Sequence, residues 1–353
     1  MKHIPVVLFG AGGVGSAVLR QIVDGRSPTA TRNHVHFTIV AVCDSQTWQF
    51  QPAGLSDAQL RQIVAQKAQG QPVGEQRPSP LQIINILAES GLEQVIVVDV
   101  TAVSGLEPTL DRALELGYGV VLANKKAFAG PWATAQHYFH HPRVRHESTV
   151  GGGQPVIATL RYLLDTNDPI HEIQGQLSGT LGFICQQLDQ GVPFSQAIAE
   201  AKTRGYTEPD PREDLGGLDV MRKVMILGRM AGWPLETADI QVESLYTQNL
   251  ADLTVPDFMA QVSVLDQAVR QRVAVAQANG QVLRYLAHLR DGKGVVGLTA
   301  VPAGSALANL KFISFRTGRY DDEPLMICGK GAGVEMTAAG VIGDMLDLGT
   351  RFE

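Results

Sequence analysis

The stretch Ile4-Pro-Val-Val-Leu-Phe-Gly-Ala-Gly-Gly-Val-Gly15 decides the fold of the first part of this chain. Ile4 to Phe9 is an apolar run, typical of a strand buried on both faces of a parallel sheet. The glycines that follow match G-x-G-x-x-G, and Ser16 to Val23 then has apolar residues at helical spacing. Such glycines allow a tight turn and let backbone N–H groups approach a pyrophosphate at the start of a helix. We therefore favour a dinucleotide-binding turn over a plain tight turn.

Outward from this turn, strand and helix patterns alternate, which predicts an α/β, Rossmann-like doubly wound parallel sheet over residues 1–150. Further strands are expected at 37–43, 95–100, 119–123 and 143–147, and helices at 106–116 and 131–138. Residues 44–79 are polar and rich in Gln, Gly and Pro, and are expected to form an excursion with one helix at 58–69.

The pattern changes near residue 150, and residues 151–330 are expected to form an α+β domain with an open mixed sheet. Its helices are predicted at 154–164, 180–190, 195–204, 214–231 and 256–278, and its strands at 170–177, 282–288, 294–300, 309–315 and 324–328. A second glycine-rich turn, Gly329 to Gly333, leads into a helix at 336–348. Residues 331–353 are expected to return to the first domain.

Composition excludes several classes of function. The chain has 353 residues, a hydrophobic content of 44% and a formal charge of -6, which suits a soluble two-domain protein and gives no electrostatic reason to expect nucleic acid. No stretch approaches the roughly 20 apolar residues of a membrane helix. The first apolar run breaks into glycines rather than a cleavage region, so a cytoplasmic location is expected.

Residues at strand ends are candidates for cofactor binding, since ligands of doubly wound sheets bind beyond the carboxyl ends of strands. Asp44 ends the second strand, where an acid accepts hydrogen bonds from the adenosine ribose and favours NAD, although it could equally cap a loop. Thr101 and Ala102 follow the third strand. Lys125 and Lys126 end the next one, and we favour a functional role for one of them over a solvated pair.

The segment Gly205 to Lys223 carries the densest charge, GYTEPDPREDLGGLDVMRK. Asp219 and Lys223 are four residues apart, so they lie on one face of a helix. The helix dipole explains acids near its start, but not Glu208 or a lysine in an otherwise apolar helical stretch, which is costly to bury unpaired. We favour a lysine that donates a proton and helps to bind a substrate.

The cysteines and histidines show no pattern that is typical of a metal site or a disulfide framework. The three cysteines, Cys43, Cys185 and Cys328, lack metal or disulfide spacing and are expected to be ordinary small buried residues. The histidines near residue 140 are expected at the surface.

Together, Leu177-Ser-Gly-Thr-Leu181 and Gly205 to Lys223 resemble the central signature of the homoserine dehydrogenases. Glu147 to Pro155 (ESTVGGGQP) resembles the domain junction of that family, and Gly331 to Gly340 its C-terminal motif. The likeness covers essentially the whole chain and is closest to the short, monofunctional form.

The resemblance implies NAD(P)-dependent, reversible reduction of L-aspartate 4-semialdehyde to L-homoserine, on the route to threonine and methionine. It implies that Lys223 is the proton donor, that Glu208 and Asp219 hold the substrate, and that Lys125 acts near the nicotinamide. It also implies a homodimer formed by the middle region and a monovalent cation, usually sodium, bound by the backbone carbonyls of Glu147, Val150, Gly152 and Gln154. The full set of candidate cofactor residues is Gly10, Gly12, Gly13, Val14, Gly15, Asp44, Thr101, Ala102, Lys125, Gly205 and Gly333.

Two other functions fit these residues less well. A non-catalytic, nucleotide-binding regulatory homologue would have no need of Lys223, Asp219 and Glu208 together. An aspartate-semialdehyde dehydrogenase needs a cysteine nucleophile beside a base, and no cysteine here has such a setting.

Overall fold

The computed structural model describes residues 1–352 and divides into two compact units. The first comprises Met1–Ala158 and Ala332–Glu353, and the second Thr159–Gly331. Sequence analysis placed the boundaries at 150/151 and 330/331. The two units instead divide at 158/159, within α8 (Val156–Asp165), and at 331/332.

The first unit is built on a seven-stranded sheet in the order β4-β3-β2-β1-β5-β6-β7. The neighbours β2-β1-β5-β6-β7 are parallel, which confirms the predicted Rossmann-like sheet. The strands are β1 (Lys2–Phe9), β2 (Val35–Cys43), β3 (Thr47–Phe50), β4 (Glu75–Gln76), β5 (Ile96–Asp99), β6 (Gly119–Leu122) and β7 (Val144–Arg145).

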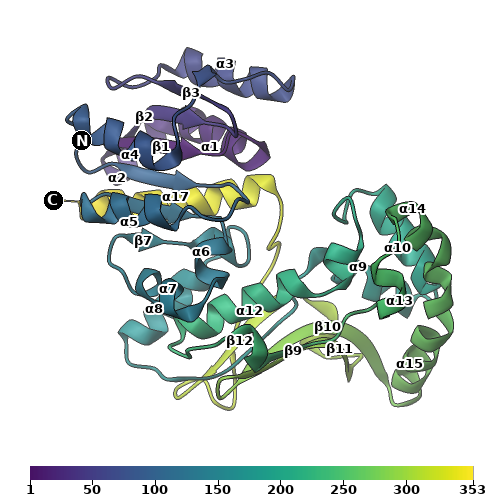
Figure 1. Cartoon of the computed structure of the whole chain (residues 1–353). Helices are drawn as coiled ribbons and strands as arrows, with labels where there is room; N and C mark the ends of the chain where they lie inside the picture. Colours follow the sequence, from purple (N-terminus) through teal and green to yellow (C-terminus); the bar gives the residue numbers. More distant parts are fainter. Residues whose placement is uncertain (353) are drawn as a thin grey trace. The chain divides into compact units, whose positions relative to one another are not determined.

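The last helix of the chain completes this unit. α17 (Val334–Arg351) packs against α1 (Gly13–Asp24), and its buried Val341, Met345 and Leu348 join the apolar core under β1 and β2. Figure 1 shows α17, in yellow, among the purple and blue elements of the unit. The remaining helices are α2 (Arg26–Asn33), α3 (Asp57–Ala68), α4 (Pro80–Glu89), α5 (Glu107–Glu115), α6 (Lys126–Ala129) and α7 (Trp132–Phe139).

The predicted excursion at 44–79 differs most from expectation. Besides α3 it contributes β3 and β4, which extend the sheet with antiparallel pairs. Trp48 is buried in β3 and stacks on Phe50, so an apolar contact fixes this short strand in polar surroundings. α2 and α4 were also not predicted, although Ser79 and Gln82 form a capping box at the start of α4.

The second unit carries a six-stranded mixed sheet in the order β13-β12-β8-β10-β11-β9. The predicted open mixed sheet is confirmed, with β9 as an added strand that pairs in parallel with β11. Its strands are β8 (Ile170–Gly175), β9 (Ile240–Val242), β10 (Gln281–Arg290), β11 (Lys293–Pro302), β12 (Phe312–Thr317) and β13 (Leu325–Cys328).

Two long predicted helices of this unit are broken. The 214–231 helix is α11 (Arg212–Leu215) and α12 (Leu218–Met230), because Gly217 takes a left-handed φ of 70° between them. The 256–278 helix is α14 (Val255–Gln261), a short 3-10 turn and α15 (Asp266–Ala278). The other helices are α9 (Gly179–Asp189), α10 (Phe194–Thr203), α13 (Gln248–Ala251) and α16 (Ala306–Asn309).

Candidate active site

The glycine turn between β1 and α1 has the geometry that a dinucleotide needs. A Cβ atom on Gly15 would overlap the carbonyl oxygen of Gly10, so only glycine lets the turn close. A Cβ on Gly12 would meet nothing within 4 Å, and Gly12 and Gly13 are exposed. No side chain caps α1, so its first N–H groups face outward and can bind an anion. These residues fit a pyrophosphate.

The start of α17 lies beside the same turn. Val334 Cγ2 is 3.4 Å from where a Cβ of Gly13 would stand. Gly333, directly before it, has a φ of 114°, a conformation that favours glycine. Two glycine-containing turns from opposite ends of the chain therefore meet at the candidate pyrophosphate site.

Asp44 caps the loop after β2. Its Oδ1 accepts hydrogen bonds from the backbone N–H of Gln46 (2.9 Å) and from both the N–H and the hydroxyl of Thr47 (2.7 and 3.0 Å), and its Oδ2 binds Lys67 Nζ at 2.8 Å. Burial opposes its charge, but these hydrogen bonds outweigh burial and lower the pKa of Asp44 to about 2. Asp44 is therefore an ionised, fully hydrogen-bonded carboxylate.

A buried polar network joins the loops that follow β5 and β6. Asn124 Nδ2 donates to Asp99 Oδ2 at 2.9 Å and to Val103 O at 2.8 Å, and the Thr101 N–H donates to Asp99 Oδ1 at 2.8 Å. Burial raises the pKa of Asp99, which is 1% exposed. Sequence reasoning named Thr101 and Ala102 but missed Asp99 and Asn124, whose position at strand ends was the available signal. The network also fixes the loop that carries Lys125, which is half-buried at the start of α6.

Lys223 lies on α12 in an ion pair. Its Nζ is 2.7 Å from Asp219 Oδ2, one turn earlier, and donates to the carbonyl of Leu177 at 2.8 Å. An ammonium group has three N–H donors. The third has no acceptor within residues 1–352, so it is available to a ligand.

Asp214 binds the loop that carries Glu208 and is close enough to this pair for their charges to act on it. Its Oδ2 accepts the backbone N–H of Glu208 at 2.8 Å, while the Glu208 residue itself is exposed. Burial raises the pKa of the Asp214 carboxyl, and the nearby charge of Asp219 adds to the rise. The helix dipole accounts for acids near the start of a helix such as Asp214, but the link between Asp214 and Glu208 appears only in three dimensions.

Arg212 anchors the loop that carries Glu208. Its Nη1 donates to the carbonyls of Ala251 and Leu253 at 2.5 and 2.7 Å, and its Nη2 binds Asp210 Oδ2 at 2.7 Å. The guanidinium also lies over the Phe258 ring, 5.4 Å from its centre. The loop is therefore tied to the segment between α13 and α14.

The segment proposed for a cation, residues 147–154, packs on α17. Both carboxylate oxygens of Glu147 accept N–H groups at the start of α8, from Ile157 (2.6 Å) and Ala158 (2.8 Å), so its side chain is already engaged. Gly151 and Gly152 have left-handed φ values of 77° and 61°. The carbonyl of Gln154 accepts the Val156 N–H at 2.8 Å, so only its second lone pair remains for a cation.

The remaining candidate residues belong to different parts of the chain. Gly205 follows α10 with a φ of 69° and lies in the second unit, whereas Lys125 lies in the first. Cys43 and Cys185 are buried as expected, but Cys328 is exposed at the end of the edge strand β13. No group of three His, Cys, Asp or Glu side chains within residues 1–352 is arranged to hold a metal ion.

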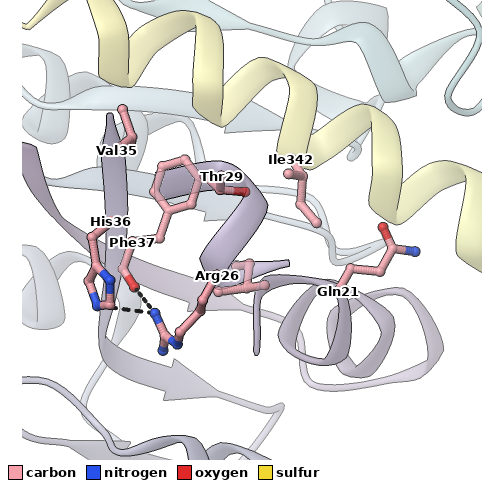
Figure 2. A pocket seen from close by; sticks show the side chains of 8 residues that line it. Gln21, Arg26, Thr29, Val35, His36, Phe37 and Ile342 are labelled. Carbon is pink, nitrogen blue, oxygen red and sulfur yellow. Dashed lines mark hydrogen bonds between the residues drawn. The ribbon is translucent and has the colours of Figure 1, made fainter. Parts of the chain in front are cut away.

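A small pocket lies near the far end of α1 (Figure 2). Arg26 there donates to the carbonyl of Phe37 at 2.9 Å and meets His36 Nε2 at 3.1 Å. Arg26 follows the C-terminus of α1, whereas the glycine turn lies at its N-terminus. This pocket is therefore separate from the candidate pyrophosphate site.

Fold and site together define a class: a two-unit α/β protein with a dinucleotide turn and a lysine–carboxylate pair, as in NAD(P)-dependent oxidoreductases. The family model for homoserine dehydrogenase matches residues 155–346, and that for the NAD-binding domain of homoserine dehydrogenase matches residues 10–140. The chain belongs to the homoserine dehydrogenase family.

Individual relatives support this family assignment. The chain is 36% identical to the homoserine dehydrogenase of Paracoccidioides brasiliensis, over 98% of this chain and 97% of that one, and 32% identical to that of Schizosaccharomyces pombe, over 98% and 95%. A bifunctional aspartokinase/homoserine dehydrogenase of Zea mays is 34% identical over 98% of this chain, which spans 38% of its length. Among solved structures, a Candida auris protein of unknown function is similar, with a TM-score of 0.89 and 32% identity over 99% of both chains.

No helix within residues 1–352 has both the length and the apolar character that crossing a bilayer requires.

Proposed function

We propose that the chain catalyses the reversible, NAD(P)-dependent reduction of L-aspartate 4-semialdehyde to L-homoserine. The observation that carries the proposal is the ammonium group of Lys223, which uses two of its donors on Asp219 and Leu177 and keeps the third available. This geometry suits a group that gives a proton to a developing alkoxide oxygen.

The residues of the second unit have separable tasks. Lys223 holds the proton, and Asp219 keeps its ammonium group oriented. Glu208 presents a carboxylate to the substrate ammonium, and Asp214 holds the backbone that carries it. Because the charge on Lys223 is already in place, it also stabilises oxygen charge as it develops.

The residues of the first unit bind the cofactor, which when bound supplies or accepts the hydride. Gly10, Gly12, Gly13, Val14 and Gly15 form the pyrophosphate turn, with Gly333 beside it. Thr101, Ala102 and Lys125 border the loops after β5 and β6. We also propose that Gly205 contacts the cofactor, because the family resemblance implies it.

A monovalent cation, sodium by resemblance, is proposed at the backbone carbonyls of Glu147, Val150, Gly152 and Gln154. The left-handed turn at Gly151 and Gly152 and the use of the Glu147 carboxylate elsewhere support ligation by carbonyls rather than side chains. We also propose a homodimer formed by residues 151–330 and a cytoplasmic location, both of which rest on the resemblance and the sequence.

The test is the absorbance at 340 nm of purified protein with L-homoserine and either NAD⁺ or NADP⁺ at alkaline pH. Homoserine-dependent reduction of either cofactor is expected. Nucleotide binding without reduction would contradict the proposal and favour a non-catalytic, nucleotide-binding regulatory protein.

A further inference from the structure

The break between α11 and α12 divides the candidate site residues of the second unit into two groups. Asp214 on α11 holds the loop that carries Glu208. α12 carries Asp219 and Lys223, one turn apart. Gly217 forms the turn between the two helices, since its N–H donates to the Asp214 carbonyl at 3.1 Å and its carbonyl accepts the first helical hydrogen bond of α12. The path of the chain at Gly217 therefore sets where the Lys223 ammonium lies relative to Glu208.

Tyr285 lies against this turn. It belongs to β10, which contacts α12 (Figure 1), and it is 3% exposed. A Cβ atom on Gly217 would stand 2.0 Å from Tyr285 Oη and 3.1 Å from Cζ. The hydroxyl therefore fills the space beside Gly217. Burial raises the pKa of Tyr285, and the nearby charge of Glu243 adds to the rise, so the hydroxyl stays protonated and acts as a hydrogen-bond donor.

The acceptor of this hydroxyl is itself held in place. Tyr285 Oη donates to the carbonyl of Glu243, the residue after β9, at 2.7 Å. The Glu243 N–H donates to the Val296 carbonyl at 2.8 Å, and Glu243 Oε2 accepts the Leu298 N–H at 3.0 Å. Arg272 of α15 binds the same carboxylate. Tyr285 therefore ties the start of α12 to β9, β11 and α15 at once.

We propose that Tyr285 is a positioning residue, whose hydroxyl fixes the first turn of α12 and thereby directs the Lys223 ammonium at the substrate oxygen. The inference rests on the proposed function, which gives Lys223 the task of protonating that oxygen. Tyr285 acts through Gly217 and through Asp219, which lies in the first turn and orients the ammonium. A misplacement of about 1 Å can cost roughly 10²-fold in rate, so the support of one helix start is enough to matter.

The proposal predicts a particular kinetic signature. Tyr285→Phe keeps the ring but removes the hydroxyl, so the first turn of α12 loses its support on the Glu243 carbonyl. The kcat for homoserine oxidation should fall roughly tenfold. KM for homoserine should stay unchanged, because Arg212 holds the loop that carries Glu208 through separate contacts.

The test is steady-state kinetics of homoserine oxidation by the full chain, beside urea unfolding of each variant. Tyr118→Phe is the matched control. Tyr118 is 2% exposed and its hydroxyl also donates to a carbonyl, that of Leu92 at 2.8 Å, but it lies in the first unit, directly before β6. Both variants lose one equivalent hydrogen bond, so both should lose similar stability, while only Tyr285→Phe should lose turnover.

A second variant tests the contact itself. In the wild type, the Cβ of Gly217→Ala meets the Tyr285 hydroxyl, whereas in Tyr285→Phe the oxygen is gone and mainly the strain of the left-handed φ remains. Gly217→Ala should therefore lower the urea midpoint more in the wild type than in Tyr285→Phe. Additive effects of the two substitutions would overturn the inference, because the hydroxyl would then not be in contact with the turn.

The kinetic outcomes separate the inference from the proposed function. A normal kcat in Tyr285→Phe, or a loss of kcat that Tyr118→Phe shares, overturns the positioning role alone. If Tyr285→Phe does not fold, Gly217→Ala decides, since a normal kcat in that variant would show that the placement of the first turn does not affect turnover. A wild-type chain that binds nucleotide but does not oxidise homoserine refutes the proposed function and the positioning role with it.

Discussion

Lys223 is the proton donor of the proposed reaction, so the proposed chemistry depends on it. Lys223→Ala removes the proton donor but leaves the glycine turn of the first unit untouched, so turnover should fall roughly 10²–10⁴-fold while nucleotide binding persists. The measurement is kcat for homoserine oxidation beside nucleotide titration. Lys293→Ala is the control, because Lys293 is an exposed lysine of the same unit that pairs with Asp239. A near-normal kcat in Lys223→Ala would refute the assignment.

Asp44 should make stability depend on pH at the acid end. Its pKa is lowered from 3.8 to about 2, so the stabilisation that its charged form provides is complete above about pH 4 and is lost as the pH falls towards 2. Urea unfolding at several pH values, followed by tryptophan fluorescence, should show a steeper loss between pH 4 and 2 in the wild type than in Asp44→Asn. Parallel curves for the two proteins would show that Asp44 is not the group responsible.

Among the elements, the loops after β5 and β6 depend on Asn124. Asn124→Ala leaves the buried Asp99 carboxylate without one of its donors and frees the Val103 carbonyl. Leaving a buried polar group unsatisfied costs about 1–3 kcal/mol, so unfolding should become easier by that amount and KM for the cofactor should rise. Asn33→Ala, at the end of α2 in the same unit, is the control, since Asn33 makes no side-chain hydrogen bond within residues 1–352. Equal stability of the two variants would contradict the role of the network.

The loop that carries Glu208 depends on Arg212 in a similar way. Arg212→Met releases this loop from the carbonyls near α13 and leaves α12, with Lys223, in place. KM for homoserine should therefore rise roughly tenfold, about 1.4 kcal/mol, with a smaller change in kcat. Arg270→Met, at an exposed position of α15, is the comparison. A fall in kcat with unchanged KM would indicate that Arg212 does not position Glu208.

Elements could be predicted from the sequence where the signal is local. β1, the glycine turn and α1 follow from adjacent residues, and the Asp219–Lys223 pair follows from a spacing of four on one helix. The ion pair between Asp44 and Lys67 spans 23 residues and joins the loop after β2 to α3, so no spacing rule reveals it. The sequence prediction ran one helix through Gly216 and Gly217, although two adjacent glycines commonly mark a turn, and the structure ends α11 there because Gly217 takes a left-handed φ.

For the whole molecule, the informative feature is that the chain ends in the unit where it began. Along the sequence, the whole second unit lies between α1 and α17, yet α17 completes the apolar core of the first unit. Three contacts hold it to the 147–154 segment and its surroundings: Ser148 Oγ donates to Thr337 O at 2.8 Å, Asp344 accepts the Glu147 N–H at 2.7 Å, and Arg145 binds Asp347. The proposed cation segment and the C-terminal motif are thus one packed structure.

Two glycines of α17 test this closure directly. A Cβ on Gly340 would overlap Ser148 Oγ and stand 2.9 Å from the carbonyl of Gly152, whereas a Cβ on Gly343 would meet nothing within 4 Å. Gly340→Ala should therefore destabilise the chain by about 1–3 kcal/mol, the usual cost of overpacking. Gly343→Ala, on the exposed side of the same helix, should stabilise it by about 0.5–1 kcal/mol, because alanine is the better helix former. The measurement is thermal and urea unfolding of the two variants. If both variants are stabilised alike, α17 does not pack on the 147–154 segment as closely as the structure shows. In that case the packing no longer supports a cation site made of backbone carbonyls.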